Sequence, residues 1–261
     1  MTEAGVASPT VLVERRDAVA VVTLNRPQRR NGLTVDMCGA IYDAVRDVAA
    51  SDARVLLLRG AGDDFCVGAD IADGGEDGGA APETLAGLGL IHHAATLLHS
   101  MPQVTIAAIA GGCAGAGMGY AAACDLRFAT PEARFSTAFL NVGVSGDMGL
   151  AWSLTRIVGG ARAREMLFFP AKFDGNAALE LGLVTRLFAR EALHDEVLAL
   201  AGQLCTRDPF ALRMMKANCV SAERLDIAEF VDIETARHLH ATGRKDFPEL
   251  MAASYRRFKG T

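Results

Sequence analysis

The chain has 261 residues, of which 51% are hydrophobic and 22% charged, as expected for a globular protein with one domain and an appendage. Its formal net charge of −5 argues against nucleic acid as the main partner, because phosphate binding needs a basic face. No apolar run reaches the roughly 18 residues that span a bilayer, and residues 1–9 lack the pattern of a signal peptide, so we expect no membrane insertion.

Strands and helices are predicted to alternate up to residue 158. In chain order the sequence predicts strands at 11–13 and 19–24, a helix at 33–50, a strand at 55–58, a surface loop at 72–82, a helix at 83–100, strands at 104–110, 126–129 and 134–136, and a helix at 148–158. Residues 14–17 separate the first two strands as a hairpin turn. Such alternation predicts a parallel sheet flanked by helices.

From about Glu191 the pattern changes to helices alone. Helical periodicity covers residues 191–207, 209–220, 226–242 and 247–259. We therefore expect a sheet-containing core followed by a helical region that packs on the core or on a neighbouring subunit.

The six cysteines are scattered along the chain. No two of them form a CxxC pair, and no His lies at metal-ligand spacing from them. This pattern predicts reduced, mostly buried thiols in a cytoplasmic protein, and no metal site.

Glycine dominates residues 111–119, which follow a predicted strand and lead into an apolar helix. Glycines let the backbone turn tightly, and the N–H groups at a helix N-terminus are fixed donors for a negatively charged oxygen. A second run of small residues, 60–71, follows the strand at 55–58. Ligands of open α/β sheets bind at the carboxyl ends of strands, so the two loops could aim two N–H groups at one carbonyl oxygen, as an oxyanion hole. The alternative is two close-packed turns without a ligand.

Five segments carry a specific pattern through their order and spacing. They are residues 25–33, 55–71, 106–119, 124–125 and 179–184. Together they resemble the enoyl-CoA hydratase/isomerase (crotonase) family over nearly the whole chain. The resemblance implies an α/β fold with a ClpP-like ββα spiral core at residues 1–190 and a C-terminal helical trimerisation region at residues 191–261.

The resemblance also implies a homotrimer or hexamer that processes acyl-CoA in fatty acid metabolism, with coenzyme A as part of the substrate and no separate cofactor. By position, it assigns the oxyanion-hole donors to the backbone amides of Ala69 and Ala116. The residues that it implies near coenzyme A are Arg26, Val67, Asp70, Ile71 and Lys259. For the charged residues a solvated surface position is the alternative, and Asp70 could instead orient or cap its own loop.

Hydratases of this family carry two glutamates that activate water, and these positions fall on Gly119 and Phe139. Hydration needs a base for the water and an acid for the α-carbon, so we expect no efficient hydratase. Asp147 is the acid that remains near the expected site, and it would act as a lone base that moves a proton between the α and γ carbons. The alternative for Asp147 is a helix N-cap, because an Asp before a helix accepts hydrogen bonds from backbone N–H groups.

The sequence therefore predicts an acyl-CoA-processing protein that stabilises a thioester enolate through backbone donors, isomerase-like rather than an efficient hydratase. One alternative is an acyl-CoA binding or shuttle protein without turnover, which Gly119 and Phe139 favour. Another is a thioester hydrolase or carbon–carbon lyase for a bulky acyl-CoA, because the small residues Gly119 and Ala116 would leave room for a larger acyl group.

Overall fold

The computed structural model describes residues 8–70 and 89–259 of the chain. The chain divides into two compact units, Met1–Thr206 and Arg207–Thr261. The first unit contains two sheets with their helices, and the second is helical. Over the described residues, no helix combines the length and apolarity needed to cross a membrane.

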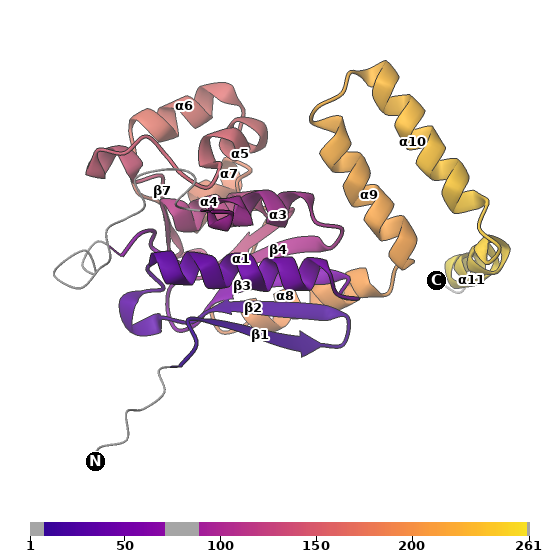
Figure 1. Cartoon of the computed structure of the whole chain (residues 1–261), viewed down its shortest axis with the longest axis horizontal. Helices are drawn as coiled ribbons and strands as arrows, with labels where there is room; N and C mark the ends of the chain where they lie inside the picture. Colours follow the sequence, from indigo (N-terminus) through magenta and orange to yellow (C-terminus); the bar gives the residue numbers. More distant parts are fainter. Residues whose placement is uncertain (1–7, 71–88, 260–261) are drawn as a thin grey trace, which may run out of the picture. The chain divides into compact units, whose positions relative to one another are not determined.

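A six-stranded sheet forms the centre of the first unit (Figure 1). In spatial order its strands are β1 (Val11–Arg16), β2 (Val19–Leu24), β3 (Val55–Gly60), β4 (Val104–Ile109), β6 (Leu126–Ala129) and β9 (Arg186–Leu187). β1 pairs antiparallel with β2, and the other neighbouring pairs are parallel. The predicted parallel sheet is therefore confirmed.

A smaller sheet contains three short strands, β5 (Gly112–Ala114), β7 (Arg134–Ser136) and β8 (Phe173–Asp174). β5 pairs parallel with β7, and β7 pairs antiparallel with β8. The sequence pattern does not predict β5, because three residues inside a glycine-rich stretch carry no readable alternation.

The described helices of the first unit pack on the larger sheet or on one another. They are α1 (Val35–Ala49), α3 (Ala94–Ser100), α4 (Ala116–Ala123), α5 (Leu150–Ile157), α6 (Gly160–Phe168), α7 (Gly175–Glu180) and α8 (Leu193–Cys205), with 3-10 turns η1 (Pro27–Arg29), η3 (Ile91–His93) and η4 (Phe139–Val142). α1 begins where the Thr34 hydroxyl accepts a hydrogen bond from the Met37 amide. α1 packs against β1 and β2, and α8 packs against β2, β3, β4 and β6.

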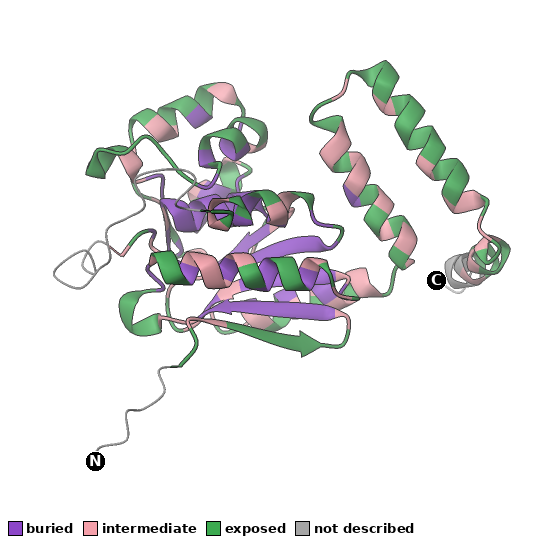
Figure 2. Ribbon diagram, viewed as in Figure 1, coloured by how far each residue is buried: buried purple, intermediate pink, exposed green. Residues whose placement is uncertain are grey.

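Burial is concentrated in the central strands and in α4 (Figure 2). Every residue of β2, β4 and α4 is buried. This explains why α4 contains only Ala, Gly, Met and Tyr, with no charged side chain. A Cβ atom at Gly117 would overlap the carbonyl oxygen of Cys66, so neighbouring backbone lies directly against the helix. Close packing on all sides therefore holds the backbone of α4 in one position.

The second unit consists, in its described part, of α9 (Pro209–Ala222), α10 (Ile227–Thr242) and α11 (Phe247–Lys259). Asp208 and Asp226 cap α9 and α10 by accepting hydrogen bonds from backbone N–H groups. Arg237 of α10 donates hydrogen bonds to Asn218 and Ser221 of α9. The three helices agree closely with the predicted ones.

Several other boundaries differ from the predicted ones. β1 continues to Arg16 and turns at Asp17, because an exposed edge strand carries polar residues that resemble a loop. The described part of the helix predicted at 83–100 is α-helical only from Ala94, after the 3-10 turn η3. The loop predicted at 72–82 lies outside the described residues.

α8 belongs to the first compact unit. It packs on the sheet with Leu193, Val197 and Ala201 buried, and the unit ends at Thr206. The division at residue 190 into a spiral core and a trimerisation region stays a prediction. Periodicity alone cannot assign α8, because an amphipathic helix has an apolar face whichever partner covers it.

Candidate functional site

Two loops meet at the carboxyl ends of β3 and β4, which are parallel neighbours. One contains residues 61–70, and the other is the glycine-rich stretch that begins at residue 111. The Cys66 amide donates to the Gly112 carbonyl at 3.0 Å, and the Ala114 amide donates to the Cys66 carbonyl at 3.0 Å. The two loops that the sequence suggests could converge are therefore in direct contact.

Each loop carries one candidate donor amide, and the two amides lie close together. Gly68 has φ +91° and Gly115 has φ +51°, conformations that favour glycine, and a Cβ atom at Gly115 would lie 3.8 Å from the Cα atom of Gly68. Ala69 and Ala116 follow these glycines. Within the described part of the chain, neither of their amides donates a hydrogen bond to the protein. The structure therefore brings Ala69 and Ala116 together with both N–H groups available.

The two amides have different surroundings. Ala69 is exposed, whereas Ala116 is the first residue of the buried helix α4. A helix N-terminus carries partial positive charge, which favours a negative oxygen there. The Leu33 amide donates to the Gly68 carbonyl at 2.8 Å, and the Leu33 carbonyl accepts from the Asp70 amide at 3.0 Å. Hydrogen bonds on both sides thus hold the Ala69 peptide in place.

Phe139, Asp147 and Met148, which follow β7 in the chain, lie close to the loop and helix that carry the Ala116 amide. The Phe139 ring comes within 3.9 Å of where a Cβ atom at Gly115 would lie. In α4, a Cβ atom at Gly119 would lie 2.6 Å from the Met148 Cβ atom and 3.4 Å from the Asp147 carbonyl oxygen. Asp147 therefore lies beside the helix that carries one of the two candidate donors.

Asp147 does not cap α5. The N-cap of that helix is Gly149, where no side chain accepts a hydrogen bond. The Asp147 carboxylate accepts instead from the Met148 amide at 2.6 Å. Met148 and Gly149 have φ +50° and +68°, so the chain turns through two left-handed residues before Leu150 begins the helix. The N-cap prediction is therefore wrong, and Asp147 is exposed.

Thiol and phenol groups near the site stay protonated. Burial raises the pKa of the Cys66 thiol to about 12. Burial also raises the pKa of the Cys38 thiol, and the negative charge of Asp147 adds to this effect. The pKa of Tyr120 is raised by burial in the same way. These groups therefore supply no anion at neutral pH. Among the described residues, no group of His, Cys, Asp or Glu side chains is arranged to hold a metal ion.

Arg26 and Arg29, in the segment after β2, bind the carboxylate of Asp70. The Asp70 side chain is 8% exposed and accepts from Arg29 at 2.7 and 2.9 Å and from Arg26 at 3.1 Å. Hydrogen bonds from Arg29, helped by Arg26, hold the pKa of Asp70 below its ordinary value. Arg26 also donates to the Gly32 carbonyl at 2.5 Å. These contacts favour the loop-orienting role among the two considered for Asp70.

The other residues predicted near coenzyme A are placed less completely. Val67 is partly buried, and its Cγ1 atom would lie 2.8 Å from a Cβ atom at Gly112. Ile71 lies outside the described residues, and Lys259 is the last residue of α11.

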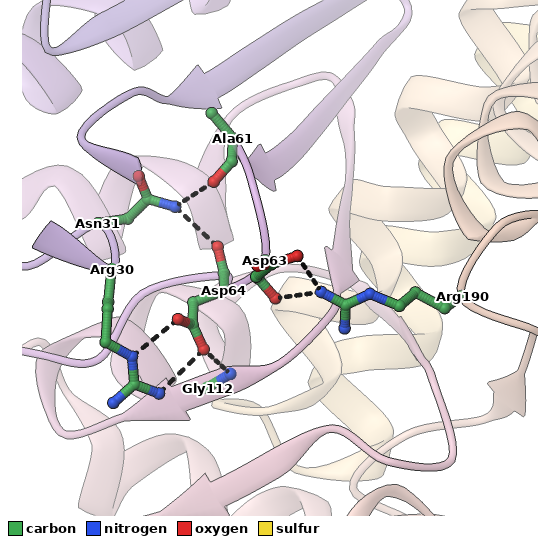
Figure 3. Close-up of polar contacts among 7 residues, drawn as sticks. All are labelled: Arg30, Asn31, Ala61, Asp63, Asp64, Gly112 and Arg190. Carbon is green, nitrogen blue, oxygen red and sulfur yellow. Dashed lines mark hydrogen bonds and ion pairs between the residues drawn. The ribbon is translucent and has the colours of Figure 1, made fainter. Parts of the chain in front are cut away.

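A polar network fastens the loop after β3 (Figure 3). The fully buried Asn31 donates from its side-chain amide to the carbonyls of Ala61 at 2.9 Å and Asp64 at 2.7 Å. The Asp64 carboxylate accepts from the Arg30 guanidinium and from the Gly112 amide. Asn31 lies in the first of the five family-like segments, which is its only sequence signal. Sequence reasoning misses Asp64, because its partners are distant in the chain.

Known proteins match the chain over most of its length. A family model described as enoyl-CoA hydratase/isomerase matches residues 14–258. The 1,2-epoxyphenylacetyl-CoA isomerase of Escherichia coli (strain K12) is 31% identical over 246 residues, 93% of this chain and 94% of the relative. The crotonyl-CoA hydratase of Syntrophomonas wolfei is 30% identical over 230 residues, 87% and 88% of the two chains. These two relatives catalyse different reactions at nearly the same identity, so identity alone does not choose between them.

A solved structure agrees with this match. The crystal structure of an enoyl-CoA hydratase subunit I from Geobacillus kaustophilus superposes with a TM-score of 0.86 at 30% identity. The superposition covers 95% of this chain and 96% of the other.

Proposed function

The chain belongs to the enoyl-CoA hydratase/isomerase (crotonase) family and has the mixed α/β crotonase fold with C-terminal helices, and from this premise we propose that it is an acyl-CoA isomerase rather than an efficient hydratase. The observation that carries the proposal is the pair of available amides, Ala69 and Ala116, next to an exposed acid, Asp147.

In the proposed reaction the thioester oxygen accepts hydrogen bonds from the amides of Ala69 and Ala116. Loss of a proton from the α-carbon forms an enolate, whose negative charge collects on that oxygen. Preorganised donors stabilise this charge more than they stabilise the neutral substrate, and loss of one such donor typically costs about 10²–10³ in rate. The tight packing of α4 supports this role, because a donor fixed in advance needs no rearrangement when the charge forms.

Asp147 is the proposed proton carrier. Its carboxylate would take the α proton of a 3-enoyl-CoA and deliver a proton to the γ-carbon, which moves the double bond into conjugation without consuming water. Two observations support this role. The Asp147 side chain is exposed, and the hydrogen bond from the Met148 amide to its Oδ1 atom fixes the direction of the carboxylate.

Hydration is disfavoured by the side chains that the family resemblance aligns with the two glutamates. Water addition needs a base for the water and an acid for the α-carbon, and each such group is typically worth about 10²–10⁴ in rate. Neither Gly119 nor Phe139 can transfer a proton. Asp147 alone can take a proton from the α-carbon and then give it to the γ-carbon. A single acid is therefore better suited to a proton shift than to hydration.

The test is incubation with a panel of 2-enoyl-, 3-enoyl- and 3-hydroxyacyl-CoA esters. Mass spectrometry detects hydration, hydrolysis or cleavage, and absorbance of the conjugated product detects isomerisation. We expect isomerisation of a 3-enoyl-CoA at least about 100-fold faster than hydration of a 2-enoyl-CoA. Hydration as fast as isomerisation would contradict the proposal, and Asp147→Asn with unchanged turnover would remove the role of Asp147.

A second candidate is an acyl-CoA binding protein without turnover. The aligned positions Gly119 and Phe139 favour it, since neither can act as acid or base. Saturable binding of acyl-CoA, with no product from any ester of the panel, would support this candidate over the isomerase.

The hydrolase or lyase alternative rests on space beside Gly119 and Ala116 for a bulky acyl group. Met148 lies against Gly119, which speaks against such space on that side. Hydrolysis or cleavage of a bulky ester in the panel would favour this alternative.

Assembly into a trimer or hexamer is also proposed, with the second unit contributing contacts. Large apolar side chains on its helices are exposed, among them Ile227 at 82%, Leu239 at 63% and Met251 at 55%. Such side chains would be covered if further copies of the chain packed against this unit. Light scattering is expected to give three or six times the chain mass of 27.5 kDa, and a monomer at every concentration would contradict the assembly.

A further inference from the structure

We propose that Asp64 is a positioning residue for the oxyanion hole: its carboxylate, clamped by Arg30, holds the Gly112 amide and thereby sets the spacing between the Ala69 and Ala116 amides. The inference rests on the proposed function, because it assumes that these two amides grip a thioester oxygen. It gives a role in catalysis to a side chain that never touches the substrate.

Both carboxylate oxygens of Asp64 are used (Figure 3). Oδ2 accepts from Arg30 Nε at 2.8 Å, while Oδ1 accepts from Arg30 Nη2 at 3.0 Å and from the Gly112 N–H at 2.5 Å. Bidentate arginine pairs and charge-assisted bonds to backbone N–H groups are shorter and stronger than neutral ones, and they fix geometry. Burial opposes ionisation of Asp64, but hydrogen bonds from Arg30 and Gly112 lower its pKa below the ordinary value. The carboxylate is therefore charged at neutral pH.

The Asp64–Gly112 hydrogen bond joins the two donor loops at their roots. Asp64 lies in the loop that leads to Ala69, and Gly112 begins β5, which leads to Ala116. The backbone hydrogen bonds between Cys66 and β5 continue from this contact toward the two amides. A shift of β5 relative to the first loop would therefore be passed on to the distance between the donors.

Gly112 is shaped for this contact. A Cβ atom there would lie 2.8 Å from Val67 Cγ1, 2.9 Å from Asp64 Oδ1 and 3.1 Å from Arg30 Nη2, so a side chain at this position would press against both members of the ion pair as well as against Val67. The main chain of Asp64 is held separately, because Asn31 donates to its carbonyl at 2.7 Å. Removal of the carboxylate charge is thus expected to loosen β5 while the loop itself remains attached.

The preceding residue provides a matched control. Asp63 carries the same charge in the same loop, but its side chain is 93% exposed and pairs with Arg190 at 2.7 Å (Figure 3). An exposed ion pair of this kind contributes little to stability, and the bonds of the Asp63 side chain run to Arg190 rather than to β5. A general effect of lost loop charge would appear in Asp63→Asn as well as in Asp64→Asn.

The experiment compares the full-length protein with Asp64→Asn, Arg30→Lys and Asp63→Asn. The change Asp64→Asn keeps the size of the side chain but breaks the bidentate pair, and Arg30→Lys keeps the positive charge without the planar fork. For each variant, kcat and KM are measured on the best ester of the acyl-CoA panel, well below the melting temperature. NMR hydrogen exchange is measured in the free protein at the amides of Cys66 and Ala114, which link the two loops.

We expect Asp64→Asn to lower kcat by about 10- to 100-fold, because misplacement of a catalytic group by a fraction of an ångström acts mainly in the transition state. KM is expected to change by less than about threefold, since ground-state binding depends less on the donors. Exchange at Cys66 and Ala114 is expected to be at least about tenfold faster. Arg30→Lys should show the same pattern more weakly, and Asp63→Asn should match the unmodified protein.

A variant Asp64→Asn that melts earlier but keeps its kcat would overturn the proposal, because the ion pair would then serve stability alone. Equal effects of Asp63→Asn and Asp64→Asn would overturn it as well. Should Asp64→Asn fail to fold, Arg30→Lys decides by the same criteria. If the unmodified protein neither turns over nor binds any acyl-CoA, the proposed function has failed, while the exchange rates still decide whether Asp64 holds the loops together.

Discussion

Met148 fills the space that a side chain at Gly119 would need: the two Cβ atoms would lie 2.6 Å apart. Met148 is 8% exposed and has a φ of +50°, so its backbone has little freedom to retreat. We expect Gly119→Ala to lower the free energy of unfolding by about 1–3 kcal/mol through overpacking. Urea unfolding followed by the fluorescence of Trp152, the single tryptophan of the chain, measures the change.

Two further variants separate overpacking from a general effect of alanine. Gly202 lies inside α8 with no atom within 4 Å of an added Cβ, so Gly202→Ala should raise stability by roughly 0.5–1 kcal/mol. The double variant Gly119→Ala with Met148→Gly removes the clashing Cβ atom of residue 148, so it should lose less stability than the sum of the two single variants. Additive losses would show that Met148 does not restrict residue 119.

Gly115 sets the direction of the Ala116 amide. Its φ of +51° and ψ of −126° are accessible to glycine and strained for alanine. We expect Gly115→Ala to lower kcat on a 3-enoyl-CoA by about 10²–10³, as for loss of an oxyanion donor, with a much smaller change in KM. Steady-state kinetics measures both quantities.

Gly182 supplies the control for that strain. It has φ +74°, and an added Cβ would meet nothing within 4 Å. Gly182→Ala should therefore cost stability and leave kcat unchanged. A similar drop of kcat in both variants would mean that strain, not donor direction, explains the result.

The pH dependence of stability should depend on Asp70. Hydrogen bonds from Arg29 and Arg26 hold its pKa in the folded protein below the value of about 3.9 in the unfolded chain. A carboxyl group with a lowered pKa stabilises the fold above its unfolded pKa, and this contribution disappears as the pH falls through the folded pKa. We expect Asp70→Asn to be less stable at neutral pH and to lose less stability on acidification below about pH 4.

Urea midpoints measured at a series of pH values test this difference. Asp52→Asn is the control, because Asp52 also pairs with an arginine but its side chain is 92% exposed. If the urea midpoints of Asp70→Asn and Asp52→Asn change with pH in the same way, the buried ion pair at Asp70 contributes no pH-dependent stability.

Asp226 caps α10 with two hydrogen bonds, from the amides of Ala228 and Glu229, both at 3.0 Å. Asp226→Ala should destabilise this helix by about 1 kcal/mol, which is typical for loss of an N-cap. Hydrogen exchange at the amides of α10 measures the local free energy of opening. Asp232→Ala, which removes an exposed acid inside the same helix, should stay within about 0.5 kcal/mol of the unmodified protein.

The inner strands β2, β3 and β4 of the larger sheet could be predicted from sequence because they are covered on both faces. β2 and β4 are nearly continuous apolar runs, a pattern typical of strands that are buried on both faces of a parallel sheet. The short elements α6, α7, β8 and β9 could not be predicted, since two to nine residues with mixed polarity give no clear period. Edge strand β1 is only partly recognisable, because its exposed face is polar.

The candidate site divides in the same way. Ala69 and Ala116 follow from the family resemblance and from the place of their loops after neighbouring strands. The contact of Asp64 with Arg30 and Gly112 joins segments that are remote in the chain, so no local pattern indicates it. The filling of the space at Gly119 by Met148 is a matter of volume, which residue types alone do not determine.

The proposed use of main-chain amides as catalytic donors has a consequence for how this protein can diversify. Substitution of Ala69 or Ala116 by any residue except proline leaves the N–H group in place, and close packing leaves no room for side chains at Gly117 and Gly119 of α4. Residues 140–147 are exposed and end at Asp147, beside that helix. New substrate preferences are therefore expected to arise by variation of this segment, and a mutant library confined to it is the most direct route to an altered specificity.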